Sequence, residues 1–237
     1  MLVSNIFFIG YASLSKYLMN YQMVMINDIM LARASACLLF SLLVAKSSGT
    51  SLYVAPGQRF WLTVRSFLGS FAFMFYQAAV QLIPLLLVQV IDGLAPFWAI
   101  LIGWIMLGSR FSPLEWFTLI VSFGAIALIY FSAQGDGEEQ KVSRKDMFIG
   151  CGFALITSAC LGFLSVLNRV LTGISFSVQL FYAGCVATII ALIFLFSDHI
   201  LNQSPLMTLS YSLTQYVLIA LAMSCNFAGL SCFVVAC

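Results

Sequence analysis

The sequence predicts an all-α polytopic membrane protein, and composition and hydropathy lead to this fold class. Hydrophobic residues make up 62% of the 237-residue chain and charged residues only 8%, whereas a soluble domain averages about 45–50% apolar and about 25% charged residues. The mean hydropathy is +1.07. Ten Lys and Arg with eight Asp and Glu cannot form the polar surface of a soluble domain this long. We therefore expect a multi-pass integral membrane protein whose main partner is the lipid bilayer.

Eight apolar stretches approach the length of about 20 residues that crosses a bilayer. They are expected at Leu2–Met19, Asp28–Ala45, Trp61–Leu82, Leu85–Leu107, Leu114–Phe131, Met147–Leu171, Val178–Phe196 and Tyr216–Cys237. The connections carry turn-forming residues, as in Lys46–Arg59. The Ile83-Pro84 connection is so short that the third and fourth helices are expected to form an antiparallel hairpin.

A charge-dense linker at residues 134–146 follows the fifth predicted helix. It divides the chain into a first repeat at 1–133 and a partial second repeat at 147–237, with weak internal similarity in matching order. An odd number of helices per repeat inserts the two halves with opposite orientation, as in many secondary transporters. We expect a bundle of two inverted five-helix repeats, with the second truncated and about eight of ten helices present.

Asp92 is the clearest candidate for a functional residue, because an ionisable group within a span costs about 2.5–3.5 kcal/mol to insert. Gln89 and Pro96 lie three residues before and four residues after it, so all three are expected on one face of a helix. Pro96 also frees the carbonyl of Asp92. This face can serve a polar substrate or a coupling proton. The structural alternative is that Asp92 pairs with a cation from a neighbouring helix.

Three cations in or near predicted spans have two interpretations each. Lys16 ends the first helix, Arg33 lies in the second, and Arg169 ends the sixth at a position equivalent to Lys16. They either extend to the membrane interface or bind an anionic group in a cavity. Near the end of the third helix, Tyr76 is a candidate for the interfacial aromatic belt. Gln77 either lines a cavity or bonds across helices.

Signatures of other function classes are missing from the sequence. It has no HExxH, P-loop or GxGxxG motif. The single histidine, His199, lies outside the predicted spans, so a Ser-His pair within the membrane cannot form. The seven cysteines form no CxxC pair. We therefore expect no enzyme activity, no metal, no cofactor and no nucleic-acid partner.

An ordered set of short motifs extends over about 90 residues of the first half. It consists of Arg65-Ser-Phe-Leu-Gly69, Tyr76-Gln-Ala78-Ala, Ile83-Pro84-Leu, Asp92-Gly-Leu-Ala-Pro96-Phe-Trp, Leu107-Gly108-Ser-Arg110 and Phe123-Gly124-Ala. This set resembles the EamA-type domain of the drug/metabolite transporter superfamily, and is most similar to eukaryotic solute carriers related to nucleotide-sugar transporters. One departure is Ser109-Arg110, where the family usually has Glu after Leu-Gly.

The resemblance implies a ten-helix transporter with a central cavity, alternating access and a cytoplasmic N-terminus. The expected partner is a small polar or anionic metabolite. Coupling of transport to protons through Asp92 and assembly as a homodimer are both left open. The alternative function is a non-transporting membrane scaffold that binds other membrane proteins, or a truncated paralogue.

Overall fold

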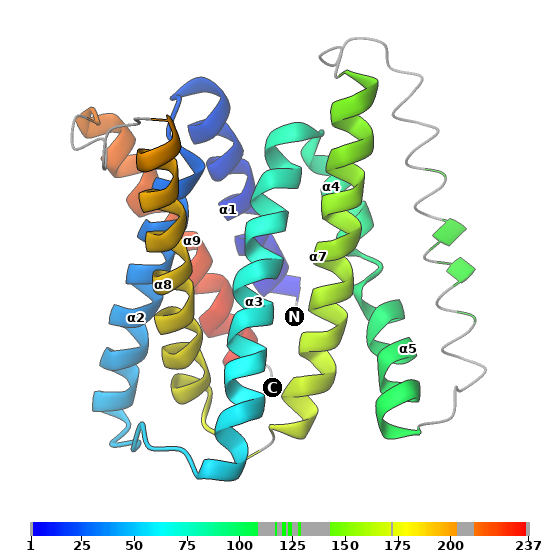
Figure 1. The fold of residues 1–237 in the computed structure, drawn as a ribbon, viewed down its shortest axis with the longest axis vertical. Coiled ribbons are helices and arrows are strands. Elements are labelled where there is room, and N and C mark those ends of the chain that lie inside the picture. Colours follow the sequence, from blue (N-terminus) through cyan, green and yellow to red (C-terminus); the bar gives the residue numbers. More distant parts are fainter. Residues whose placement is uncertain are drawn as a thin grey trace. The chain divides into compact units, whose positions relative to one another are not determined.

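The computed structural model describes residues 2–108, 117, 120–121, 123–124, 128, 143–171, 173–202 and 211–235. These residues form helices and no strand (Figure 1). The helices are α1 (Leu2–Tyr21), α2 (Ile26–Ser47), α3 (Pro56–Leu82), α4 (Leu85–Asp92), α5 (Ala95–Leu107), α7 (Arg144–Val170), α8 (Phe176–Asn202) and α9 (Leu213–Val235). The all-helical fold class is therefore confirmed for this part of the chain.

The chain forms two compact units, which we describe separately. Unit 1 contains Met1–Ser70 and Gly173–Cys237, and unit 2 contains Phe71–Thr172. Helix α3 begins in unit 1 and ends in unit 2. The division into inverted repeats at 1–133 and 147–237 stays a prediction.

Most predicted helices are present with small shifts of their ends, and three predictions need correction. Helix α3 begins at Pro56, where proline suits the first turn of a helix, so the predicted connection Lys46–Arg59 is shorter. Helix α7 begins at Arg144, inside the predicted linker. The predicted fourth helix, Leu85–Leu107, is interrupted between α4 and α5. The predicted fifth helix, Leu114–Phe131, falls largely outside the described residues.

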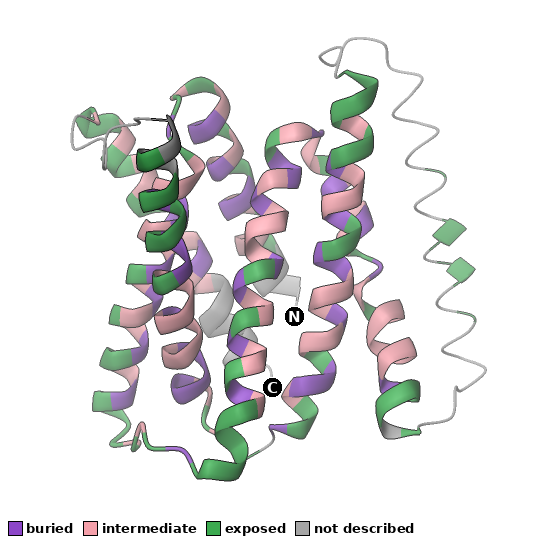
Figure 2. Cartoon of the chain, viewed as in Figure 1, coloured by how far each residue is buried: buried purple, intermediate pink, exposed green. Residues whose placement is uncertain are grey.

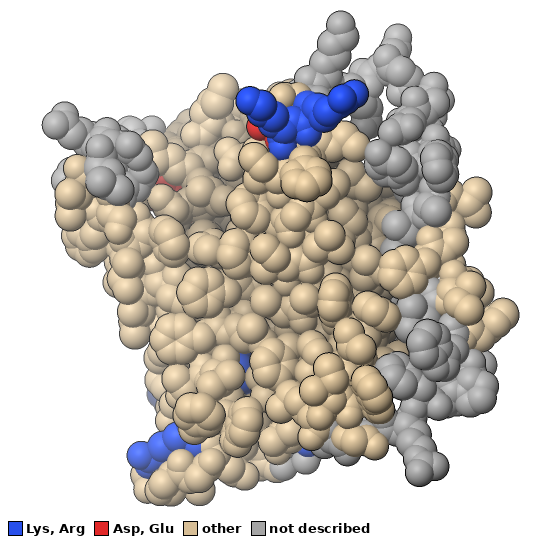
Figure 3. Space-filling model, turned by 45° about the vertical axis from the view of Figure 1, so that its right-hand side comes forward, with Lys and Arg blue, Asp and Glu red and all other residues tan. Residues whose placement is uncertain are grey.

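Four segments of the described part are long and apolar enough to cross a membrane. They are Ile26–Ser47, Leu85–Met106, Arg144–Val170 and Phe176–Ser197, while Leu213–Ala228 is a shorter apolar helix. Their outward faces are strongly apolar: in α2, Leu39 and Leu43 are 64% and 66% exposed. Most side chains on the face drawn in Figure 3 are likewise uncharged. Such surfaces are expected where lipid replaces water as the solvent.

Unit 1 is built from α1, α2, α8 and α9 with the first part of α3, and α1 packs on α9 and α2 on α8. The loop between α1 and α2 turns at Met23, whose φ of 51° is uncommon for a residue other than glycine. Tyr211 donates a hydrogen bond to the Asp28 carboxylate, and Gln215 Nε2 donates to the Gln22 carbonyl at 2.8 Å. The first bond connects the first turn of α2 to the segment just before α9, and the second connects the α1–α2 loop to α9.

Unit 2 is built from α4, α5 and α7 with the last part of α3, and α7 packs against both α4 and α5. One side of α7 is buried (Figure 2). Its buried residues include four small ones at intervals of four, Gly150, Ala154, Ser158 and Gly162. This spacing places them on one stripe of the helix, and such residues let helices approach closely.

Candidate functional site

The candidate site is the interruption between α4 and α5 in unit 2. Gly93 and Leu94 separate the two helices. Pro96 has no backbone N–H and cannot bond the carbonyl of Asp92 four residues back. The Leu94 N–H donates to the Ile91 carbonyl at 3.0 Å, one residue short of the α-helical partner, Val90. The carbonyls of Val90 and Asp92 therefore lose their normal helical donors.

The interruption lies inside the apolar segment Leu85–Met106. Asp92 is seven residues after its start, or about 10 Å along the helix at 1.5 Å per residue. The segment is about as long as the hydrocarbon core of a bilayer is thick. Asp92 is therefore a carboxylate at the end of α4, within a segment long and apolar enough to cross a membrane. Secondary transporters use the ends of such half-helices to bind polar substrates and ions.

The Asp92 side chain has one oxygen that its surroundings leave unsatisfied. Oδ1 is buried and has no hydrogen-bond partner among the described residues. The structural alternative was that Asp92 pairs with a cation from a neighbouring helix. The described residues show no such ion pair. A buried polar atom without a partner costs about 1–3 kcal/mol, more if charged, and native proteins keep few of them. Asp92 thus has the chemistry expected of a group that binds a ligand or an ion.

Gln89 and Tyr76 are joined by a hydrogen bond across the α3–α4 hairpin. Gln89 Nε2 donates to the Tyr76 hydroxyl at 2.7 Å. This bond orients the side chain of Gln89, which lies about one helical turn before Asp92. A place of Tyr76 in an interfacial aromatic belt stays a prediction. Gln77 is fully buried in α3 and also has an interaction partner.

Pro96 differs from the prediction. Gln89 and Asp92 belong to α4, whereas Pro96 is the second residue of α5 and is exposed. We had expected the three residues on one face of a single helix. The interruption between α4 and α5 instead separates Pro96 from Gln89 and Asp92. Pro96 contributes to the site through its backbone, by helping to end α4.

The three candidate cations are divided between the two units. Lys16 in α1 and Arg33 in α2 belong to unit 1, where both are half-buried and have interaction partners. Arg169 is in the last turn of α7 in unit 2 and is exposed. Within unit 2, Asp92, Gln89 and Tyr76 are brought together and Arg169 is not. An anion-binding role of the cations stays a prediction.

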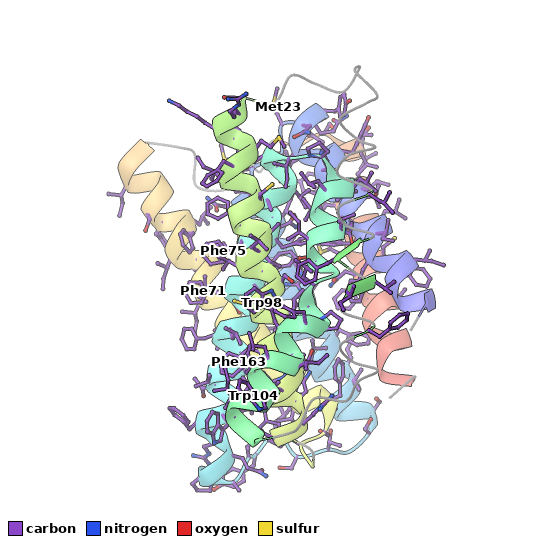
Figure 4. All side chains as sticks on the ribbon, turned by 90° about the vertical axis from the view of Figure 1, so that its right-hand side faces the viewer. Met23, Phe71, Phe75, Trp98, Trp104 and Phe163 are labelled. Atoms are coloured by element: carbon purple, nitrogen blue, oxygen red, sulfur yellow. The ribbon has the colours of Figure 1, made fainter. Side chains whose placement is uncertain are left out.

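Two buried polar residues on neighbouring helices were not predicted. Ser158 on α7 has no exposed surface, and its Oγ has no hydrogen-bond partner among the described residues. Trp98 Nε1 on α5 is also buried without one, and Trp98 lies between Phe75 and Trp104 in Figure 4. The stripe of small residues at intervals of four on α7 was the sequence signal that could have identified Ser158.

The contact between α5 and α7 is close at Gly162. A Cβ atom placed there would lie 2.7 Å from the Ala99 nitrogen and 2.8 Å from the Ala95 carbonyl oxygen. Only glycine permits this approach of the two backbones. It holds the beginning of α5, and with it the helix interruption, against the buried stripe of α7.

Comparison with known sequences gives one family match. The profile of the EamA-like transporter family matches residues 1–131, which include α1 to α5. No curated protein matches the chain significantly.

Proposed function

Because the chain belongs to the EamA-like transporter family, we propose that it is a secondary transporter that moves a small polar or anionic metabolite by alternating access. Members of this family are membrane transporters and not enzymes, and the apolar segments identify an integral membrane protein. In the proposed mechanism the polar group at the α4–α5 interruption lines the pathway of the substrate or of a coupling ion.

The observation that carries the proposal is the position of Asp92. An isolated carboxylate inside an apolar span costs about 2.5–3.5 kcal/mol, and its Oδ1 has no partner in the described part of the chain to offset this. A substrate amine, a substrate hydroxyl or a proton would offset it. Two half-helices also give backbone groups on both sides of the interruption, which supports binding at this depth.

The first experiment identifies a ligand with purified protein in detergent. Its thermal unfolding is followed with a panel of amino acids, organic acids, sugar phosphates and nucleotide sugars. A ligand of the native state raises the apparent stability. A panel in which no compound raises the unfolding temperature would favour the membrane scaffold over the transporter.

The second experiment measures uptake of the radiolabelled hit into proteoliposomes. We expect Asp92→Asn to lower the uptake rate about tenfold or more, equivalent to about 1.4 kcal/mol. The matched control is Asp146→Asn, which removes the same charge from an exposed residue in the first turn of α7. Uptake by Asp92→Asn at the rate of the control, with equal amounts of reconstituted protein, would contradict the role given to Asp92.

A further inference from the structure

The glycine contacts of α7 define its register against α4 and α5. Gly150 faces the side chain of Ile83, and Gly162 faces the backbone of Ala95 and Ala99. Residue numbers rise together along the two segments, so α7 runs parallel to the α4–α5 segment (Figure 1). The two segments therefore run in the same direction, with the twelve residues from Gly150 to Gly162 beside about fourteen residues from Ile83 to the Ala95–Ala99 stretch.

This register places Ser158 level with Asp92. On α7, Ser158 lies two thirds of the way from Gly150 to Gly162. On the other segment, Asp92 lies about two thirds of the way from Ile83 to the centre of the Ala95–Ala99 stretch. Ser158 belongs to the buried stripe of α7 that packs against α4 and α5. Two buried oxygens without partners in the described residues, Asp92 Oδ1 and Ser158 Oγ, thus occur at one depth on adjacent helices.

Other oxygen atoms lie at the same depth. The carbonyls of Val90 and Asp92 lack their usual helical donors, because Leu94 bonds Ile91 and Pro96 has no N–H. Both belong to the last turn of α4, where the helix dipole is negative. Carboxylate, hydroxyl and carbonyl oxygens are the ligands of hard cations, and unwound carbonyls at half-helix ends bind sodium ions in transporters.

The charge of the surroundings favours a single positive charge. In the described part of unit 2, the charged residues other than Asp92 are Arg144, Lys145, Asp146 and Arg169 at the two ends of α7. Asp146 and Arg169 are twelve and eleven residues from Ser158, or about 16–18 Å along the helix. Among the described residues of unit 2, none of these charges therefore compensates the negative charge of Asp92. Calcium sites take six to eight oxygen ligands, commonly from several carboxylates, so one carboxylate fits a monovalent ion.

From this arrangement we infer that the α4–α5 interruption and Ser158 of α7 form a binding site for a sodium ion. Asp92 supplies the charge, Ser158 a neutral oxygen, and the end of α4 the carbonyl oxygens. The ion compensates the buried carboxylate and satisfies the Ser158 hydroxyl. Its role in coupling rests on the proposed transport function, whereas its binding does not.

The test measures binding of radioactive sodium to the purified full chain in detergent, with choline chloride keeping the ionic strength constant. We expect saturable binding. Loss of a group that only supports a ligand already weakens metal affinity about 10–100-fold. Loss of a direct ligand should cost at least as much, so Ser158→Ala should raise the Kd about tenfold or more and Asp92→Asn about 100-fold or more. The controls are Ser165→Ala, which changes an exposed serine of the same helix bonded to the Leu161 carbonyl at 3.0 Å, and Asp146→Asn.

The outcomes separate this site from the transport proposal. Binding that is absent, or unchanged in both Asp92→Asn and Ser158→Ala, overturns the sodium site. Protons occupying Asp92 instead would appear as stabilisation by lower pH with no effect of sodium, and this also overturns it. Sodium binding without uptake of any compound supports the site and contradicts transport. Uptake without sodium dependence supports transport and contradicts a role of the ion in coupling, while the binding measurement alone decides whether the site exists. If Asp92→Asn fails to fold, Ser158→Ala decides the test.

Discussion

Replacing Gly162 by alanine is expected to destabilise unit 2, because the added methyl group has no room. Its Cβ would lie 2.7 Å from the Ala99 nitrogen and 2.8 Å from the Ala95 carbonyl oxygen. Both are backbone atoms, so no side-chain rotation relieves the contact. The shortest contact would be with the Trp98 Cβ atom at 2.4 Å, so helices α5 and α7 must separate by about 1 Å to bring it to the 3.4 Å of ordinary packing.

The size of the effect follows from this separation. A gap of about 0.5–1 Å loses roughly a quarter to a half of the dispersion energy of the contacting atoms, and overpacking of this kind costs about 1–3 kcal/mol. Gly152→Ala on the same helix is the matched control, since a Cβ there meets nothing within 4 Å. It should be neutral or stabilise by up to about 1 kcal/mol through helix propensity. The two variants should differ by about 1–4 kcal/mol.

The assay is reversible unfolding in mixed micelles as the mole fraction of a denaturing detergent is raised, which gives the free energy of unfolding of each variant. Sodium binding by Gly162→Ala should weaken as well, because the separation moves α7 away from the α4–α5 interruption. Equal free energies of unfolding for Gly162→Ala and Gly152→Ala would refute the close packing of α5 on α7.

Two further predictions concern hydrogen bonds between segments. Tyr76→Phe removes the 2.7 Å bond to Gln89 and should lower the free energy of unfolding by about 0.6 kcal/mol, at most about 1.7; an equal effect in a Gln89→Ala background would contradict the pairing. Tyr211→Phe removes the bond to the Asp28 carboxylate and should cost about 1.5–3 kcal/mol, measured by the same unfolding assay. Tyr21→Phe, at a 73% exposed position, is the control, and an equal loss there would contradict the prediction.

Much of the fold could be predicted because a bilayer restricts the possible structures. Backbone polar groups in lipid must bond within their own segment, so long apolar stretches become helices. The ends of α3 and α7 were misplaced for a related reason: helix ends extend beyond the bilayer into polar sequence, where hydropathy gives no signal. Arg144 and Pro56 both begin helices from within predicted connections.

The candidate site was predictable only in part. A lone carboxylate in an apolar stretch identified Asp92, and Pro96 indicated a disturbed carbonyl, but neither showed that the helix ends at Asp92 and restarts at Ala95. A proline within a helix either kinks or breaks it, and only the structure shows which hydrogen bonds remain. Gly93 and Leu94 keep αR backbone angles, and the Leu94 N–H bonds the Ile91 carbonyl instead of the Val90 carbonyl. Ser158 was not among the predicted site residues, and the hydrogen bond between Tyr76 and Gln89 was not predicted either.

Sequence alone therefore determined the membrane environment, the helical class, the family and the exceptional position of Asp92, because these depend on composition and on the order of residues along the chain. Tertiary structure decided which groups share a depth with Asp92. From the contacts of Gly150 and Gly162 we infer that Ser158 is level with the helix interruption, and a hydrogen bond joins Gln89 to Tyr76. Such pairings depend on the register of helices far apart in the sequence, which hydropathy along one chain does not specify.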